Sequence, residues 1–147
     1  MSKSSLRVFL AVAFLLIGSA AAVTEVAMVM ATQRSAPAHV VQTALEHPNV
    51  LKGARLNNDS GKAIASYRIG WANVYPNAIE LRRGSPINVR RGIKPGDTHD
   101  VPDQVMPFNE SAQSVIFFVA EVTFADGSNW EVDIKDIAPE AALQFSR

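Results

Sequence analysis

One stretch of the sequence constrains the fold more than any other: residues 114 to 134, SVIFFVAEVTFADGSNWEVDI. Its first half is apolar at almost every position, as expected of a strand covered on both faces. Asp126-Gly127 favours a tight hairpin turn, and the residues that follow alternate between polar and apolar. The stretch therefore predicts a central strand followed by a more exposed one, within a sheet that packs against a second layer.

Upstream residues give the same kind of signal. Residues 64 to 75 (IASYRIGWANVY) alternate with period two and place Ala65, Tyr67, Ile69 and Trp71 on one core face. Residues 50–56, 79–82 and 87–91 also read as strands, and residues 40–45 (VVQTAL) suit a strand better than a short helix. Six or seven strands, frequent turn signals and no long helical pattern favour an all-β, two-sheet sandwich.

Three segments carry a family resemblance: LNNDSGKAIASYRIGW, the later KPGD turn, and the closing VAEVTFADGSNW hairpin. Together they resemble the small immunoglobulin-like sandwiches of exported bacterial proteins, many of unknown function. The resemblance covers about Val40 to Ile137 and implies a single immunoglobulin-like domain. The chain has no cysteine and so lacks the Cys and Trp spacing of antibody domains. The resemblance therefore implies an architecture and brings no site residues.

The N-terminus has the three-part layout of a secretory signal peptide. Lys3 and Arg7 precede an apolar run over residues 8–17, and the small residues GSAAA follow at 18–22. We expect cleavage after Ala20 or Ala22 and a secreted or periplasmic protein. The alternative is a retained anchor continuing through residues 26–31, which would bury Glu25 in hydrocarbon. The expected organisation is a signal peptide (1–22), a flexible segment (23–39), the sandwich (40–137) and a short tail (138–147) that could form a helical turn.

Composition argues against several functional classes. The chain has 14 basic and 14 acidic residues, and removal of Lys3 and Arg7 with the signal leaves a small acidic excess. A nucleic-acid binder needs the opposite balance. No cysteine is present to act as a nucleophile, and neither Gly84-Ser85 nor Gly127-Ser128 has the GxSxG form of a serine hydrolase. We therefore predict a non-enzymatic protein with no catalytic residues and no cofactor.

A histidine and three aspartates between Pro95 and Pro102 or just beyond raise the question of a metal site. Zinc and EF-hand calcium sites need ligand patterns that this stretch lacks. Aspartates commonly bond their own backbone in turns. We therefore predict a hydrated surface turn, not a metal site, with counter-charge from Arg90, Arg91 and Lys94. The cluster comprises Asp97, His99, Asp100 and Asp103.

Some individual side chains also carry expectations. Glu121 interrupts an apolar strand, so it needs solvent or a partner, and Arg68 on the neighbouring long strand is the expected partner. Trp71 and Trp130 fall on apolar strand faces and are expected to pack in the core rather than to stack on sugars. The sequons at Asn58 and Asn109 would mark surface loops in a glycosylating host.

Five basic residues lie within thirteen positions on what should be two adjacent strands: Arg82, Arg83, Arg90, Arg91 and Lys94, here called the basic strip. Such runs usually form a solvated, neutralised surface, and the alternative is an anion-binding site. We predict an exported interaction or accessory module that contacts an unknown protein or surface polymer. The alternative is a carbohydrate- or anion-binding module that uses the strip. Membrane contact is expected only if the N-terminal apolar segment is retained.

Overall fold

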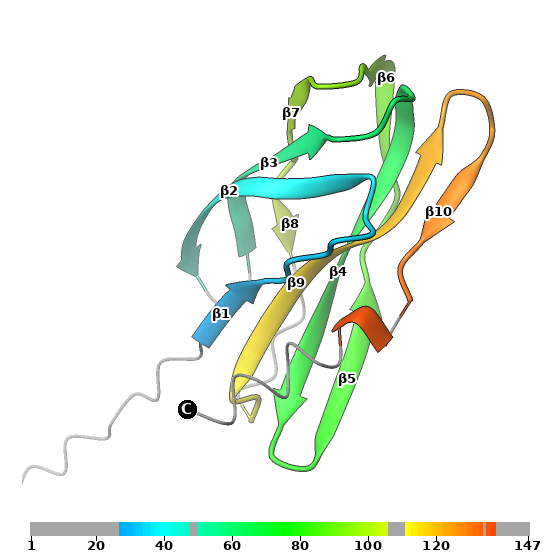
Figure 1. Ribbon diagram of the computed structural model, residues 1–147. Coiled ribbons are helices and arrows are strands. Elements are labelled where there is room, and N and C mark those ends of the chain that lie inside the picture. The colour runs from blue at the N-terminus through cyan, green and yellow to red at the C-terminus, as the bar shows by residue number, and fades with distance from the viewer. Residues whose placement is uncertain (1–26, 48–49, 106–110, 134, 138–147) are drawn as a thin grey trace, which may run out of the picture.

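The computed structural model describes residues 27–47, 50–105, 111–133 and 135–137, and these residues form two facing β-sheets (Figure 1). The six-stranded sheet contains β1 (Ala27–Met30), β4 (Ile64–Tyr75), β5 (Ala78–Arg83), β6 (Ile87–Ile93), β9 (Ser114–Phe124) and β10 (Asn129–Glu131). The four-stranded sheet contains β2 (Ala38–His47), β3 (Val50–Asn58), β7 (Thr98–Asp100) and β8 (Gln104–Val105). The expectation of an all-β, two-sheet architecture is confirmed.

The strand order puts β9 and β4 at the centre of the larger sheet. β4 pairs antiparallel with β9 on one side. On its other side, the first part of β4 pairs with β6 and the second part pairs with β5. The far side of β9 pairs with β1 along its first half, in parallel, and with β10 along its second half. In the smaller sheet β3 lies between β2 and the two short strands β7 and β8.

The main core lies between the two sheets because both contribute an apolar face to it. Tyr67, Ile69 and Trp71 of β4 point into it as expected, but Ala65 does not belong to it. The pairing register of β4 shifts between Ile64 and Ser66, and Ile64 enters the core instead. Residues from the facing layer and from β9 also belong to this inner cluster, among them Leu51, Ala54, Leu56, Val115, Phe117, Val119 and Val122.

The outer face of the larger sheet carries a second, smaller apolar cluster, so β9 is buried on both faces as its sequence predicts. The segment after β10 covers part of this face with Val132 and Ile137, and residues 135–137 form one helical turn. Trp71 is 7% exposed within the inner cluster, and Trp130 is partly buried against both clusters. The expected core role of the two tryptophans is therefore confirmed for Trp71, and Trp130 packs at a margin.

Several expectations need correction or fall outside the described residues. The seven expected strands are present, and three further short strands, β1, β7 and β8, were not anticipated. Residues 23–39 were expected to be flexible, but residues 27–30 form β1 and residue 38 begins β2. Backbone N–H and C=O groups that leave water need hydrogen-bond partners, and β9 supplies them to residues 27–30. The predicted signal peptide (1–22) and the tail (138–147) lie outside the described residues.

Within the part of the chain that the structure describes, no helix has the length and apolar character needed to cross a membrane.

Candidate functional site

The basic strip runs along one sheet edge instead of crossing two adjacent strands. β5 and β6 follow one another along the same side of β4 and do not pair with each other. Arg82 forms an ion pair with Glu80, and Arg83 forms one with Glu131. These two arginines are therefore already paired with carboxylates of the same sheet.

The other three cations of the strip are exposed. Asn88 and Ile93 of β6 pair with β4, and the pairing register shifts between them. Arg90 and Arg91 lie within this irregular part of the strand. Lys94 begins the turn that follows β6. Arg90, Arg91 and Lys94 form no ion pair with any other described residue. The structure thus divides the strip into a paired half on β5 and an unpaired half on β6 and the turn that follows it.

Glu80 shows how the paired half is built. Glu80 and Arg82 are two positions apart on β5, so their side chains lie on the same face of the strand. The hydrogen bond from the Arg82 guanidinium holds the pKa of the Glu80 carboxyl below its ordinary value, although partial desolvation opposes this shift. Asn73 and Tyr75 of β4 also donate to the carboxylate and lower its pKa. Arg82 is therefore tied into the sheet rather than free to bind a ligand.

The predicted contact between Arg68 and Glu121 is confirmed. The two residues are direct cross-strand partners on β4 and β9, and Arg68 Nε lies 3.0 Å from Glu121 Oε2. Arg68 Nη1 also donates to the Gly84 carbonyl at 3.3 Å. On the other side of Glu121 its cross-strand partner is Glu131, a second carboxylate. Like charges directly opposite each other are unfavourable, and the ion pairs with Arg68 and Arg83 offset that repulsion.

The four residues of the histidine and aspartate cluster are separated in the structure. Asp97 closes the predicted turn, its N–H donating to the Lys94 carbonyl at 3.0 Å. Residues 98–100 form β7, a strand rather than a loop. Consecutive strand residues point to opposite faces, so His99 and Asp100 diverge. Asp103 is exposed beyond the end of β7.

His99 and Asp100 each have a partner of their own. His99 Nδ1 lies 3.1 Å from the Tyr67 hydroxyl, with the two rings edge to face. Asp100 pairs with Arg55 of the neighbouring strand, at 3.3 Å between Oδ1 and Nε, and not with the expected cations of β6. Among the described residues, no group of three or more His, Cys, Asp or Glu side chains is placed to hold a metal ion.

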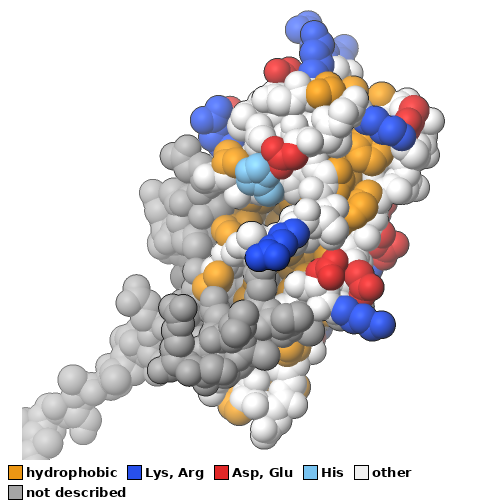
Figure 2. Space-filling model, viewed as in Figure 1, with side chains coloured by type: hydrophobic (Ala, Val, Ile, Leu, Met, Phe, Trp, Pro, Cys, Tyr) orange, Lys and Arg blue, Asp and Glu red, His pale blue; other side chains and the backbone are white. Residues whose placement is uncertain are grey.

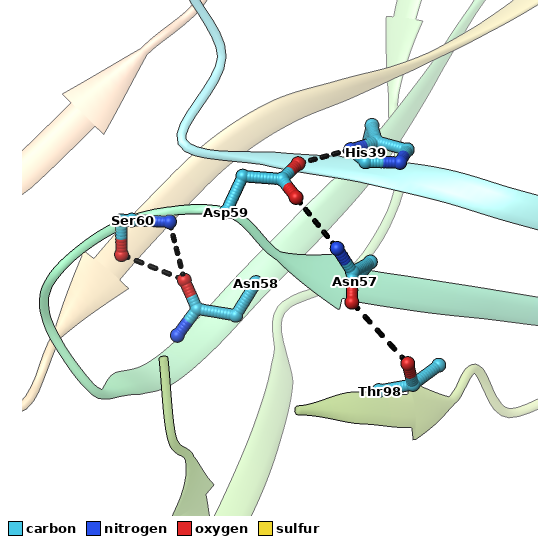
Figure 3. Close-up of polar contacts among 6 residues, drawn as sticks. All are labelled: His39, Asn57, Asn58, Asp59, Ser60 and Thr98. Carbon is cyan, nitrogen blue, oxygen red and sulfur yellow. Dashed lines mark hydrogen bonds and ion pairs between the residues drawn. The ribbon is translucent and has the colours of Figure 1, made fainter. Parts of the chain in front are cut away.

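A different polar network lies across the smaller sheet (Figure 3). His39 of β2, Asn57 of β3 and Thr98 of β7 are neighbours in one cross-strand row. Thr98 Oγ1 donates to Asn57 Oδ1 at 3.3 Å, and Asn57 Nδ2 donates to Asp59 Oδ1 at 2.5 Å. The other oxygen of Asp59 pairs with His39 Nδ1. The network therefore links all three strands to the turn after β3.

A histidine paired with a carboxylate is a common element of nucleophilic catalysis, but the nearby serine is committed elsewhere. The Ser60 hydroxyl donates to Asn58 Oδ1 at 2.6 Å and is 2.9 Å from the Lys62 carbonyl. It therefore stabilises the turn, as Figure 3 shows. The His39 and Asp59 side chains are 48% and 39% exposed, a range in which ion pairs contribute little to stability.

The sequence contained no readable signal for this network. His39, Asn57 and Thr98 come from three separate segments, and only the strand register brings them together. Asn58 was also misread: its sequon predicts an exposed acceptor, yet its side chain is completely buried. A buried side-chain amide that is fully hydrogen-bonded cannot serve as a surface glycan site. Asn109 of the second sequon lies outside the described residues.

The face shown in Figure 2 carries both basic and acidic side chains, and neither charge covers it alone. This distribution agrees with the paired contacts described above. Comparisons with models of protein families, with curated proteins and with solved structures find no match. The functional argument therefore rests on the described residues.

Proposed function

We propose that this chain is an exported, non-enzymatic interaction or accessory module, and that its sandwich is immunoglobulin-like. The chain passes from β3 in one sheet to β4 in the other and returns to pair β7 with β3, and β9 then joins β4. This alternation between facing sheets supports an immunoglobulin-like topology. The basic, apolar and small-residue order of residues 1–22 supports export.

The observation that carries the proposal is the exposed edge of β2. This ten-residue strand pairs only with β3 among the described residues, and Val41 on it is 47% exposed. Sheet edges are usually protected by charged residues, and the opposite sheet supplies an example in the arginines of β5 and β6. β2 contains neither lysine, arginine nor proline; its acidic residue is Glu46, and its pairing with β3 is regular over Ala38–Val40 and irregular beyond. Such an edge favours a protein partner that adds a strand.

Site-specific photo-crosslinking in cells that export the chain tests this proposal. A photoreactive residue at Val41 should give one discrete adduct with another protein. The same residue at Asp103, which is exposed in the connection between β7 and β8, serves as the matched control. The proposal is contradicted if position 41 gives no adduct or if both positions give the same pattern.

A second function, binding to an anionic surface polymer, is favoured by one specific observation. Arg90, Arg91 and Lys94 are exposed cations within five positions that have no ionic partner among the described residues. Cations without an internal counter-charge are available to bind external anions. The unpaired half of the basic strip is therefore the better candidate, and Arg82 and Arg83 are not expected to contribute.

Retention on a sulfated polysaccharide matrix tests this second function. Replacing Arg90, Arg91 and Lys94 by serine should lower the salt concentration at which the protein elutes. The matched control replaces Arg34, Lys52 and Lys135, which also lack an ion pair with described residues but are scattered in the sequence. Equal loss of retention in the two variants, or salt-insensitive flow-through of the wild type, would contradict local anion binding.

A further inference from the structure

The strand β6 leaves regular pairing in its middle. Ile64 and Ser66 of β4 are two positions apart, whereas their partners Ile93 and Asn88 on β6 are five positions apart. More residues of β6 than of β4 therefore lie between these two pairs, and they form a bulge, here called the β6 bulge (residues 89–92). Among the described strands β6 pairs only with β4, so the bulge lies at an open edge of the larger sheet.

The β6 bulge brings a charged side chain out of the core phase of the strand. Ile87 and Ile93 are buried in the inner apolar cluster, and Val89 packs against it. Even numbers of positions separate these three residues, so in a regular strand Arg91 would share their face and point into the core. Arg90 and Arg91 are instead both exposed. The bulge thus presents two consecutive arginines to solvent, where regular alternation would bury the second one.

Gly92 supplies the backbone conformation at the end of the bulge. Its φ is 64°, a left-handed value that residues with a side chain rarely adopt. A Cβ atom at this position would lie 3.3 Å from the Ile64 carbonyl oxygen, which is closer than ordinary van der Waals contact. The packing of Val89 holds the other end of the bulge. The backbone beneath the two arginines is therefore fixed before any ligand binds.

No internal carboxylate is paired with the arginines of the bulge. Among the described residues neither of them forms an ion pair, and Lys94, which follows closely, forms none either. The other two consecutive arginines of the basic strip, Arg82 and Arg83, are paired with Glu80 and Glu131. Two neighbouring guanidinium groups without a counter-charge repel each other, so an external anion between them would be stabilised.

The number of acceptor oxygens decides which anion fits two guanidinium groups. Each guanidinium presents a planar fork of N–H donors that binds two oxygens at once. A carboxylate has two oxygens, enough for one fork, whereas a sulfate or phosphate ester group has three free oxygens and can accept from two forks together. The bulge is therefore better suited to a sulfate or phosphate ester than to a carboxylate.

We propose that the β6 bulge is an oxyanion site in which Arg90 and Arg91 together bind one sulfate or phosphate ester group of a polysaccharide, and that Gly92 is its positioning residue. The inference rests on the second function proposed above and deepens it, because it names the class of anion and the device that presents the arginines.

Exchange of arginine for lysine tests the site, because lysine keeps the charge but lacks the planar fork. The full chain carrying Arg90→Lys and Arg91→Lys is compared with the wild type and with Arg82→Lys/Arg83→Lys, whose arginines are paired internally. Binding is measured to dextran sulfate, dextran phosphate and carboxymethyl dextran of equal charge density at one ionic strength. The wild type should prefer the ester-bearing dextrans, and the tighter of the two identifies the source of the ester. The bulge variant should bind them about tenfold more weakly, and the β5 variant should bind like the wild type.

Gly92→Ala tests the positioning role. Alanine is strained at positive φ and would crowd the Ile64 carbonyl, so the bulge should shift and binding to the esters should weaken. Gly127→Ala places the same strain in the distant β9–β10 hairpin, with open space around the methyl group, and should bind like the wild type. Equal binding by these two variants would overturn the positioning role of Gly92.

Two other results would overturn the two-arginine site: equal binding of carboxymethyl dextran by the wild type, or undiminished ester binding by the lysine variant. Lysine protects a sheet edge as well as arginine does, so the latter result would assign Arg90 and Arg91 to edge protection. If the serine variant of Arg90, Arg91 and Lys94 still loses retention in that case, the second function stands and only the oxyanion site fails.

Discussion

At the scale of single residues, Asn58 shows how one side chain can hold several segments together. Its Nδ2 donates at 2.8 Å to both the Lys62 and the Ile93 carbonyls, and its Oδ1 accepts from the Ser60 N–H and hydroxyl. Its own N–H donates to the Asp97 carbonyl. Asn58 therefore joins the end of β3 to the turn that follows it and to the turn between β6 and β7.

Replacing Asn58 should be costly because its side chain is completely buried and its hydrogen bond to the Ile93 carbonyl is buried with it. Asn58→Ala removes the Nδ2 donor that the Lys62 and Ile93 carbonyls share and the acceptor of the Ser60 N–H, and should lower the free energy of unfolding by about 2–4 kcal/mol. Asn58→Asp keeps the shape but directs a carboxylate at the same two carbonyls, so at neutral pH it should cost at least as much. Urea denaturation measures both effects. Asp103→Ala, at an exposed site, is the control, and wild-type stability of Asn58→Ala would contradict this account.

Tyr67 makes stability dependent on alkaline pH. Burial raises the pKa of its phenol above the ordinary value of 10.0, so the fold favours the protonated form. Its contribution is complete below pH 10.0 and is lost as the pH rises above that value. Tyr67→Phe should lose about 1 kcal/mol with the contact to His99, but its stability should fall less steeply above pH 10.0. Parallel pH profiles for the two proteins would show that Tyr67 is not responsible.

At the scale of elements, the pairing of β4 with β9 defines the larger sheet, and a glycine allows one close contact within it. Gly70 lies opposite Phe118, and a Cβ atom built on Gly70 would lie 2.4 Å from the Phe118 ring. The ring covers the glycine on the outer face, where Phe118 belongs to the smaller apolar cluster. The strand therefore tolerates a residue of poor strand propensity because its partner occupies the space above it.

Gly70→Ala is accordingly expected to destabilise the sheet. The added methyl group forces the Phe118 ring out of its packing position, and overpacking of this kind costs about 1–3 kcal/mol. Thermal unfolding measures the loss. The double variant Gly70→Ala/Phe118→Leu should lose less stability than the sum of the losses in the two single variants, because the smaller side chain leaves room for the methyl group. Strict additivity of the two substitutions would contradict the proposed clash.

The ion pair between β4 and β9 should contribute modestly. Arg68 and Glu121 are 34% and 30% exposed, so solvent screens their attraction only in part. Glu121→Gln should lower the free energy of unfolding by about 0.5–1 kcal/mol, and a double-mutant cycle with Arg68→Gln should attribute most of that loss to the pair. Glu80→Gln, whose partner is its near neighbour in the same strand, provides the comparison. Unchanged stability in Glu121→Gln would mean that the carboxylate gains nothing from Arg68.

At the scale of the whole molecule, local sequence patterns predicted the strands, but they did not predict most of the contacts between distant segments. Alternation and turn residues located seven strands, and the apolar Ser114–Ala120 stretch predicted its own central position. The Arg68 and Glu121 contact was predictable because it needs only two strands to be adjacent. The role of Asn58 was not, because it depends on segments brought together by the finished fold. The division of the basic strip was not predictable either, because it depends on the finished fold bringing a carboxylate from another strand to Arg83 and none to Arg90, Arg91 and Lys94.

The N-terminal segment is expected to be essential to the whole sandwich. A chain beginning at Val23 retains β1 and Gln33, whose side-chain amide bonds to the N–H and the carbonyl of Val119, and should fold normally. A chain beginning at Arg34 leaves β9 open from Ser114 to Val119. The shorter chain should melt at least about 5 °C lower and should elute partly as aggregate in size-exclusion chromatography. Equal melting temperature and size for the two chains would show that the segment is dispensable.

The pairing of β1 with β9 also has a consequence for the order of events during synthesis. The first strand of the sheet is made early, but its partner is made more than eighty residues later, since Gln33 and Val119 are 86 residues apart. Local hairpins such as β4–β5 can form as they emerge, but the parallel pairing must wait for the C-terminal part of the chain. The larger sheet can therefore be completed only after residues 114–119 have been synthesised. Until then the nascent chain is incompletely folded, which is the state that the export proposed above would require.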